Sequence, residues 1–200
     1  MSTLQIPYSS IPLSVELPSL NSISDADFVE FCLANQHLRI ERTADGEIII
    51  MPPAFSDTGN RNFNLAVALG VWAEKDGKGI GFDSSAGCTV PNGAKRSPDA
   101  AWILLDRWNA LTSEQQASFA PVCPDFVVEL RSASDTLKNL QDKLKEYIEN
   151  GARLGLLIDR KGRTVYRYRP GQTVEVLENP ATVACDPELA GFVLNMAKIW

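Results

Sequence analysis

The clearest pattern of hydrophobic positions lies between residues 135 and 150, where large apolar side chains recur every three or four positions. This spacing is typical of an amphipathic helix with one buried face. Asp135 or the preceding Ser134 can cap the start of the helix, and Gly151 can end it. The apolar stripe consists of Leu137, Leu140, Leu144, Tyr147 and Ile148.

Residues 125–131 show the alternation of a β-strand, in which successive side chains point to opposite faces of the sheet. Phe126, Val128 and Leu130 share one face, which we expect to be core. The other face carries the polar groups, among them Glu129. Because this strand is followed by the helix at 135–150 and an apolar strand at 154–158, the order predicts a right-handed β-α-β crossover.

Other patterns complete the outline of the fold. A helix is predicted at 23–34, with Ser24 as a possible N-cap. Asp45-Gly46 predicts a hairpin turn in which both residues have positive φ. Helix 60–74 presents Phe63, Val67, Gly70 and Val71 on one face. The remaining predictions are an arm at 1–21, strands at 38–42, 47–51, 80–84, 87–90, 99–105, 164–168 and 174–177, and a helical excursion at 109–120.

This order of elements predicts an α/β fold, with a mixed central sheet flanked by helices. The length of 200 residues suits a single domain over 22–200 after the arm. No apolar run reaches the roughly 18 residues that a membrane span needs. Four scattered cysteines and one histidine argue against a zinc site and favour reduced thiols in a cytoplasmic protein.

The net charge of −6 argues weakly against non-specific binding of nucleic acid. The charge is unevenly distributed, however, because residues 138–169 hold nine basic and four acidic side chains. A basic region on an acidic protein can contact phosphates. A solvated helix face and a charged hairpin would explain the same pattern.

Three residues suggest a chemical site. Glu129 interrupts an apolar strand, and an ionised carboxylate is costly to bury unless it is paired or binds a metal. Asp99 follows Ser-Pro, and Lys143 lies at the border of the apolar stripe, where its ammonium can reach the sheet edge. Two carboxylates and a lysine could bind Mg²⁺ and hydrolyse a phosphodiester. The same combination also occurs by chance in many α/β domains.

Several ordered segments together resemble the Uma-two family, a prokaryotic group of restriction-endonuclease-like proteins formerly described as a domain of unknown function. The resemblance extends over about residues 22–199. The segments are LRIERTADGEIIIMPPA (38–54), RSPDAAW (96–102), CPDFVVELRSASD (123–135), KLKEYIENGARLGLLID (143–159) and VYRYRPGQTVEVL (165–177).

The resemblance implies the PD-(D/E)xK nuclease fold with an N-terminal β-hairpin extension, and Asp99 and Glu129 as ligands of Mg²⁺ or Mn²⁺. The strand lysine of that motif is Arg131 here, and arginine cannot act as a base. Lys143 matches the helix lysine that replaces it in the family. Glu47, or Glu41 in the same hairpin, is a candidate for a further acidic ligand. The helix position near Asn60, often histidine in relatives, carries no proton-transfer group.

Each candidate also has a structural explanation. Asp99 could form an Asx turn, Glu129 a buried ion pair with Arg131 or Lys143, and Arg131 a structural salt bridge. Lys143 and Glu47 could simply be solvated. Asp125 could end or cap a strand, Asp159 reads as a turn residue, and the tryptophans at 72, 102 and 108 read as core or interface.

The favoured function is a divalent-metal-dependent DNA endonuclease, cytoplasmic and homodimeric, with Asp99, Glu129, Arg131 and Lys143 in its catalytic site. One alternative is a non-cleaving module that binds nucleic acid or a partner through the same fold. Another is a hydrolase of small phosphorylated substrates.

Overall fold

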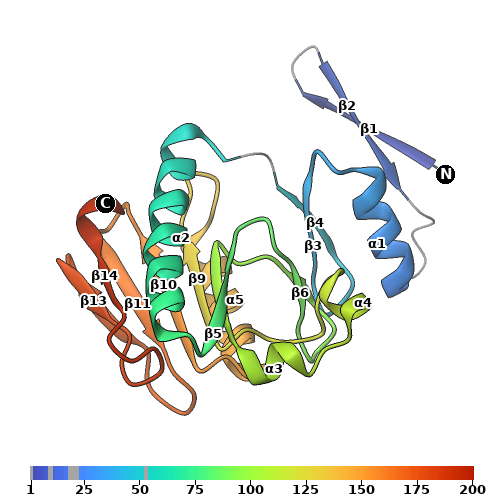
Figure 1. Ribbon diagram of the computed structural model, residues 1–200. Coiled ribbons are helices and arrows are strands. Elements are labelled where there is room, and N and C mark those ends of the chain that lie inside the picture. The colour runs from blue at the N-terminus through green and yellow to red at the C-terminus, as the bar shows by residue number, and fades with distance from the viewer. Residues whose placement is uncertain (1, 9–10, 18–22, 52–53) are drawn as a thin grey trace. The chain divides into compact units, whose positions relative to one another are not determined.

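The structure is a computed structural model that describes residues 2–8, 11–17, 23–51 and 54–200 (Figure 1). The chain divides into two compact units, Met1–Pro53 and Ala54–Trp200. The boundary between them falls after the hairpin predicted at 38–51. The predicted division into an arm at 1–21 and a single domain at 22–200 stays a prediction.

In its described residues, the first unit contains two antiparallel strand pairs and one helix. Strands β1 (Ser2–Tyr8) and β2 (Ile11–Leu17) pair within the segment predicted to be an arm. Helix α1 (Asp25–Ala34) begins as predicted, because the Ser24 side chain accepts a hydrogen bond from the Asp27 amide. Strand β3 (Arg39–Arg42) pairs with β4 (Ile48–Met51), which confirms the second hairpin.

The turn of this hairpin differs from the prediction in one respect. Gly46 has φ +88°, but Asp45 does not have positive φ. The Gly46 amide donates to the Thr43 carbonyl at 3.0 Å, and the Thr43 amide donates to the Glu47 carbonyl at 2.9 Å. A longer loop with one left-handed residue therefore replaces the two-residue turn, which relieves Asp45 of an unfavourable conformation.

The second unit is built on a six-stranded sheet in the order β12-β11-β10-β9-β8-β5. Strands β9 and β10 are parallel, as the predicted crossover requires, and the other neighbours are antiparallel. The bounds are β5 Gly79–Asp83, β8 Ala100–Leu104, β9 Phe126–Leu130, β10 Leu154–Asp159, β11 Thr164–Tyr168 and β12 Glu175–Glu178.

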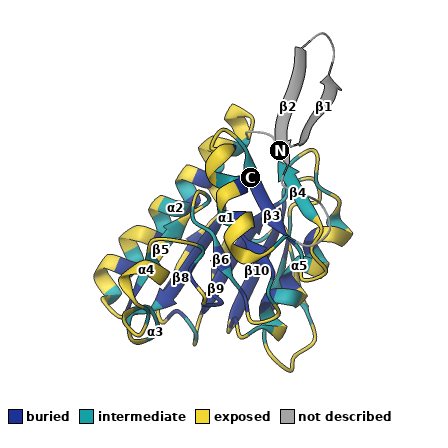
Figure 2. Ribbon diagram, turned by 90° about the vertical axis from the view of Figure 1, so that its right-hand side faces the viewer, coloured by how far each residue is buried: buried dark blue, intermediate teal, exposed yellow. Residues whose placement is uncertain are grey.

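One helix covers each face of this sheet (Figure 1). On one face, α2 (Ser56–Asp76) packs with Phe126, Val128 and Leu130 of β9. On the other, α5 (Leu137–Glu149) packs with Val127. The central strands β8, β9 and β10 are almost wholly buried between the two layers (Figure 2).

Helix α5 follows the predicted stripe, with Leu140, Leu144 and Tyr147 buried. Its N-cap is Thr136, one residue after the predicted candidates, because Asp135 instead accepts hydrogen bonds from Ser132. A Cβ at Gly155 would lie 2.6 Å from Leu144 Cδ1, so a residue without a side chain lets the helix approach β10 closely.

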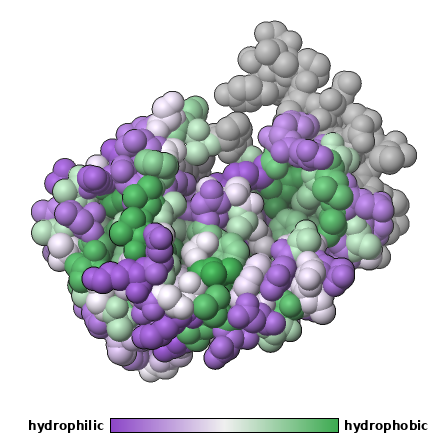
Figure 3. Space-filling model, in the orientation of Figure 1, coloured by the Kyte–Doolittle hydropathy of each residue, from purple (hydrophilic) through white to green (hydrophobic). Residues whose placement is uncertain are grey.

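Helix α2 corrects the prediction for 60–74. It is longer, and the predicted apolar face is the exposed one, with Phe63 and Val71 about two-thirds exposed. Leu65, Leu69 and Ala73 lie against the sheet instead. Figure 3 shows hydrophobic surface along this helix.

Short elements complete the second unit. The helix predicted at 109–120 is two short helices, α3 (Leu105–Asn109) and α4 (Ser113–Gln116). The remaining elements are β6 Cys88–Thr89 paired with β7 Lys95–Arg96, β13 Thr182–Ala184 paired with β14 Val193–Asn195, and the 3-10 helix Met196–Lys198.

The cysteines and tryptophans are structural. No disulfide forms within the described residues, which include all four cysteines. Burial raises the pKa of the Cys123 and Cys185 thiols to about 12, so both are protonated and unreactive at neutral pH. Trp72 and Trp102 stack at 5.4 Å between ring centroids in the α2 core, and Trp108 packs on Phe82. In the part of the chain that is described, no helix could span a bilayer.

Candidate functional site

Asp99 lies where β8 begins, beside the end of β9. Its backbone amide donates to the Val128 carbonyl at 3.0 Å, and its Oδ2 accepts from the Leu130 amide at 2.8 Å. The backbone and the carboxylate of Asp99 therefore contact the residues on either side of Glu129. These partners lie outside the Ser-Pro-Asp turn, so the side chain links two strands.

Glu129 points from β9 toward α5. Its Oε1 lies 2.8 Å from the Lys143 Nζ and 3.3 Å from the Tyr147 hydroxyl, which donates to it. The Glu129 and Lys143 side chains are only 6% and 12% exposed. The Lys143 ammonium is thus a direct charge partner of the Glu129 carboxylate, which offsets part of the free-energy cost of burying both groups.

Lys143 occupies the position predicted for it at the border of the apolar stripe. Its stem passes beside Tyr147, with the ammonium 5.9 Å from the ring centroid, and its head reaches the sheet. The solvated-lysine explanation does not hold, since the side chain is mostly withdrawn from solvent and pairs with Glu129. Tyr147 was predicted only as core, and its hydroxyl is a contributor to the site that periodicity could not reveal.

Arg131 points elsewhere. Its Nη1 lies 3.0 Å from Oδ2 of Asp159 at the end of β10, and its Nε donates to the Asp135 carbonyl at 3.3 Å. This is the salt bridge that the sequence offered as an alternative. Asp159 was predicted to be a turn residue, and its Oδ1 does accept from the Lys161 amide at 3.0 Å, but the residue is also buried and its Oδ2 closes this ion pair.

The two hairpin glutamates belong to the first unit. Glu47 is exposed next to the turn, and its amide donates to the Thr43 hydroxyl at 3.0 Å. Glu41 is buried in β3. Since each unit is described by itself, the role of Glu47 as a metal ligand stays a prediction.

Asn62 is a site residue that the sequence analysis missed. It lies on the buried face of α2, and its Nδ2 donates to Asp99 Oδ1 at 3.0 Å. A signal was present, because Asn62, Leu65, Leu69 and Ala73 follow one another at helical spacing and one of the four is polar.

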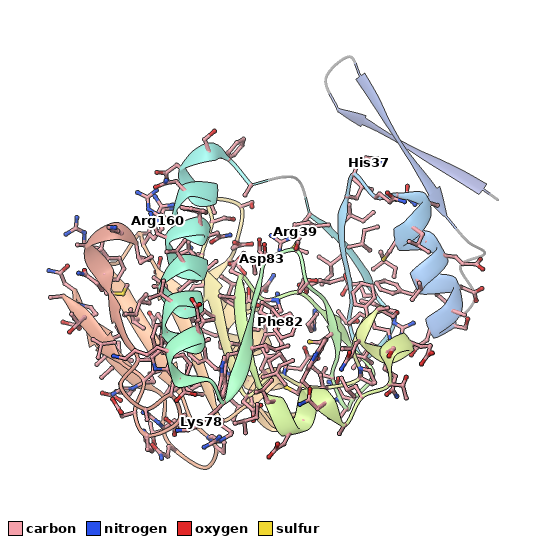
Figure 4. The ribbon with its side chains drawn as sticks, viewed as in Figure 1. His37, Arg39, Lys78, Phe82, Asp83 and Arg160 are labelled. Carbon is pink, nitrogen blue, oxygen red and sulfur yellow. The ribbon has the colours of Figure 1, made fainter. Side chains whose placement is uncertain are left out.

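A basic pocket adjoins the first turn of α2. It has a volume of about 310 Å³, and its lining includes Arg131, Arg160 and Lys161 together with the carboxylates of Asp57 and Asp159. Arg160 lies beside the beginning of α2 (Figure 4), where it pairs with Asp57. Part of the basic segment predicted at 138–169 thus lies one to two helical turns from Asn62.

The donor chemistry fits a hard divalent cation. Within the described ranges, no group of three or more histidine, cysteine, aspartate and glutamate side chains could hold a metal ion. Mg²⁺, however, commonly takes one or two carboxylates, with water and phosphate oxygens completing its shell. Asp99 and Glu129 can supply the carboxylates, and Asn62 adds a buried amide oxygen that accepts no hydrogen bond from any described residue.

Comparison with known proteins identifies the relatives. The structure resembles a crystal structure titled "putative nuclease belonging to DUF820", from Anabaena variabilis, with a TM-score of 0.67 and 20% identity over 80% of this chain and 88% of that one. This likeness confirms the predicted fold. No protein with a curated function matches the chain. The family model described as "Putative restriction endonuclease" matches residues 25–197. The chain therefore belongs to the Uma2 family, as its sequence motifs indicated.

Proposed function

We propose that the protein is a divalent-cation-dependent endonuclease that hydrolyses phosphodiester bonds in DNA. The observation that carries the proposal is the buried pair of Glu129 and Lys143 beside Asp99. Asp99 is hydrogen-bonded to the backbone on either side of Glu129, and Glu129 pairs with the Lys143 ammonium, so the two carboxylates belong to neighbouring strands at the same end of the sheet. Membership in a family of restriction-endonuclease-like proteins supports the same reading.

The roles follow from the contacts. Asp99 and Glu129 would hold the cation, which supplies Lewis-acid activation of water and phosphate. The Leu130 amide and the Tyr147 hydroxyl each donate to one of these carboxylates, which limits their rotation. The Lys143 ammonium lies 2.8 Å from Glu129 Oε1, where it can orient a water molecule or neutralise charge that develops on phosphate.

In this proposal Arg131 and the neighbouring basic pocket bind the DNA backbone. The Arg131 guanidinium has five N–H donors, and the Asp159 pair and the Asp135 carbonyl engage only some of them. Lys161 adds a further positive charge to the pocket, where Arg160 pairs with Asp57. These groups contact phosphate and do not take part in proton transfer.

We also infer a cytoplasmic homodimer. Thiols without disulfides suit a reducing compartment. The exposed apolar residues Phe63, Val67 and Val71 recur every four positions on α2 and could pack on a second copy. Sedimentation that gives a monomer mass at high protein concentration would contradict the dimer.

The experiment is a cleavage assay on supercoiled, linear and single-stranded DNA with Mg²⁺ or Mn²⁺. We expect cleavage by the wild type, strong loss in the Asp99→Asn and Glu129→Gln variants, and none in chelator. Lys145→Met is the matched control, since Lys145 is exposed on the same helix. Absence of cleavage on every substrate would overturn the proposal.

One observation favours a second candidate, a non-cleaving DNA-binding module. The strand cation of the nuclease motif is arginine here, and it forms a salt bridge with Asp159. Salt-dependent DNA binding by the Asp99→Asn, Glu129→Gln double variant, without cleavage by the wild type, would support this candidate.

A further inference from the structure

The amide of Asn62 is bonded on one side only. Its Nδ2 donates to Asp99 Oδ1 at 3.0 Å. Among the residues that the structure describes, none donates a hydrogen bond to its Oδ1, although that atom is buried and the whole residue is only 9% exposed. Buried polar atoms are nearly always hydrogen-bonded, so this oxygen requires an explanation.

A rotated amide does not provide one. Exchanging the two ends of the side chain would place Oδ1 against the Asp99 carboxylate, and two acceptors at 3.0 Å repel each other. The hydrogen bond to Asp99 therefore determines which end is the oxygen. Asn62 thus faces Asp99 with a donor and presents an acceptor to the space beside it.

The position of Asn62 in α2 makes this arrangement stable. The residue lies in line with Leu65 and Leu69, which anchor the helix to the sheet, and their packing restrains the Asn62 backbone. A leucine of similar size at position 62 would continue the apolar face without an unpartnered oxygen. The amide thus costs stability in the ligand-free protein, as polar groups at functional sites commonly do.

We propose that Asn62 is a positioning residue, whose Oδ1 accepts a hydrogen bond from a water molecule bound to a divalent cation at Asp99. This inference rests on the proposed function and adds a residue to its site. Mg²⁺ retains several of its waters in proteins, and each such water is a strong donor. The Asn62 amide is therefore complementary to both partners, because it donates to the carboxylate and accepts from the water.

The test measures Mn²⁺ binding and not activity, with EPR detection of free Mn²⁺ in the absence of DNA. We expect Asn62→Leu to weaken Mn²⁺ binding about tenfold, the loss typical when an outer partner of a metal ligand is removed. Its melting temperature in chelator should match that of the wild type or exceed it, since the buried unpartnered oxygen is gone. The control, Asn64→Leu, alters an asparagine on the same helix with hydrogen bonds of 3.3 and 3.4 Å, and should bind Mn²⁺ normally.

A second variant keeps the test decisive if Asn62→Leu does not fold. Asn62→Asp keeps an acceptor but places a second carboxylate against Asp99. We expect a lower melting temperature in chelator and a larger rise on adding Mn²⁺ than in the wild type, because the cation neutralises the added charge. If the role of Asn62 is purely structural, Asn62→Asp should lower the melting temperature by the same amount with and without Mn²⁺.

The outcomes separate the two proposals. If the wild type binds Mn²⁺ through Asp99, as the loss in Asp99→Asn would show, and Asn62→Leu binds it equally well, the inference about Asn62 is wrong and the proposed function stands. If the wild type binds no Mn²⁺, or binds it independently of Asp99, both are overturned.

Discussion

Asp99 and Asp125 occupy corresponding places at opposite ends of the same strand pair. Asp99 stands before β8 and accepts from the amide of Leu130, the last residue of β9, at 2.8 Å. Asp125 stands before β9 and accepts from the amide of Leu104, the last residue of β8, at 3.0 Å. Each carboxylate thus ties the beginning of one strand to the end of its neighbour.

The two ends of the strand pair differ in the group that contacts the second oxygen of each carboxylate. The other oxygen of Asp125 lies 2.9 Å from the Arg107 guanidinium of α3, so that carboxylate is neutralised by a cation from the segment that follows β8. Asp99 Oδ1 accepts instead from the neutral amide of Asn62, and the residue that lies between its two backbone partners on β9 is Glu129. A carboxylate that accepts from the last amide of the neighbouring strand is thus part of a neutralised ion pair at one end. At the other end, the same kind of contact holds a carboxylate that has a neutral second partner.

The strongest test of this contrast is removal of charge at the Asp99 end. Asp99→Asn keeps the shape of the side chain, so the free energy of unfolding should change by less than about 1 kcal/mol. DNA cleavage should fall about 1,000-fold, or roughly 4 kcal/mol, because a cation ligand is lost. Cleavage rates and urea denaturation measure the two effects, and a variant with undiminished cleavage would remove Asp99 from the site.

Lys143→Met should have the next largest effect. The change keeps the apolar stem and removes the ammonium, and we expect about 100-fold slower cleavage, or roughly 3 kcal/mol. It also leaves the Glu129 carboxylate without this partner, so urea denaturation should show a loss of stability that reverses when Glu129→Gln is added. If the double variant is no more stable than Lys143→Met, the buried pair is not coupled in the way the structure implies.

At the other end of the strand pair, Asp125→Asn should destabilise the protein and spare its chemistry. The buried Leu104 amide and the Arg107 guanidinium lose a charged acceptor, which should cost about 2 kcal/mol of unfolding free energy. Folded protein should bind Mn²⁺ and cleave DNA at the wild-type rate. A specific loss of Mn²⁺ binding would erase the distinction between the two aspartates.

The smallest effect is expected at Asp57, an exposed carboxylate that also pairs with arginines. Hydrogen bonds from Arg61 and Arg160 lower the pKa of Asp57 below its ordinary value of 3.8. A lowered pKa stabilises the folded state above the ordinary value, and this contribution is lost as the pH falls through the folded-state pKa. Urea denaturation of Asp57→Asn should therefore show a slight loss near neutral pH that disappears in acid, and a constant difference would contradict the assignment.

Local patterns predicted the elements of the sheet well. Alternation located β9, and the three-to-four spacing located α5, because both patterns record how one segment meets the core. The pattern failed for α2, which carries two apolar stripes. Periodicity cannot tell which stripe docks, and the sheet selected Leu65 and Leu69 over Phe63 and Val67.

The candidate site likewise contains residues that the sequence could identify and contacts that it could not. Glu129 and Lys143 were identifiable as candidates, because a carboxylate in an apolar strand and a lysine beside an apolar stripe are anomalies visible in sequence. Asp99 was identifiable from the Ser-Pro-Asp motif and the family resemblance. The partner of Arg131 was not identifiable, since Asp159 follows it by 28 positions and resembles an ordinary turn residue. Asn62 was missed because its partner Asp99 is 37 positions away.

By itself, the sequence determined the family, the strand and helix order, and the residue types that could perform metal-dependent chemistry. Only the tertiary structure decided which charges meet: Lys143 with Glu129, Arg131 with Asp159, and Asn62 with Asp99. The physical reason is the difference between distance along the chain and distance in space. Propensity and periodicity act over one or two turns of chain, whereas an ion pair or hydrogen bond depends on a few ångströms between atoms that packing brings together.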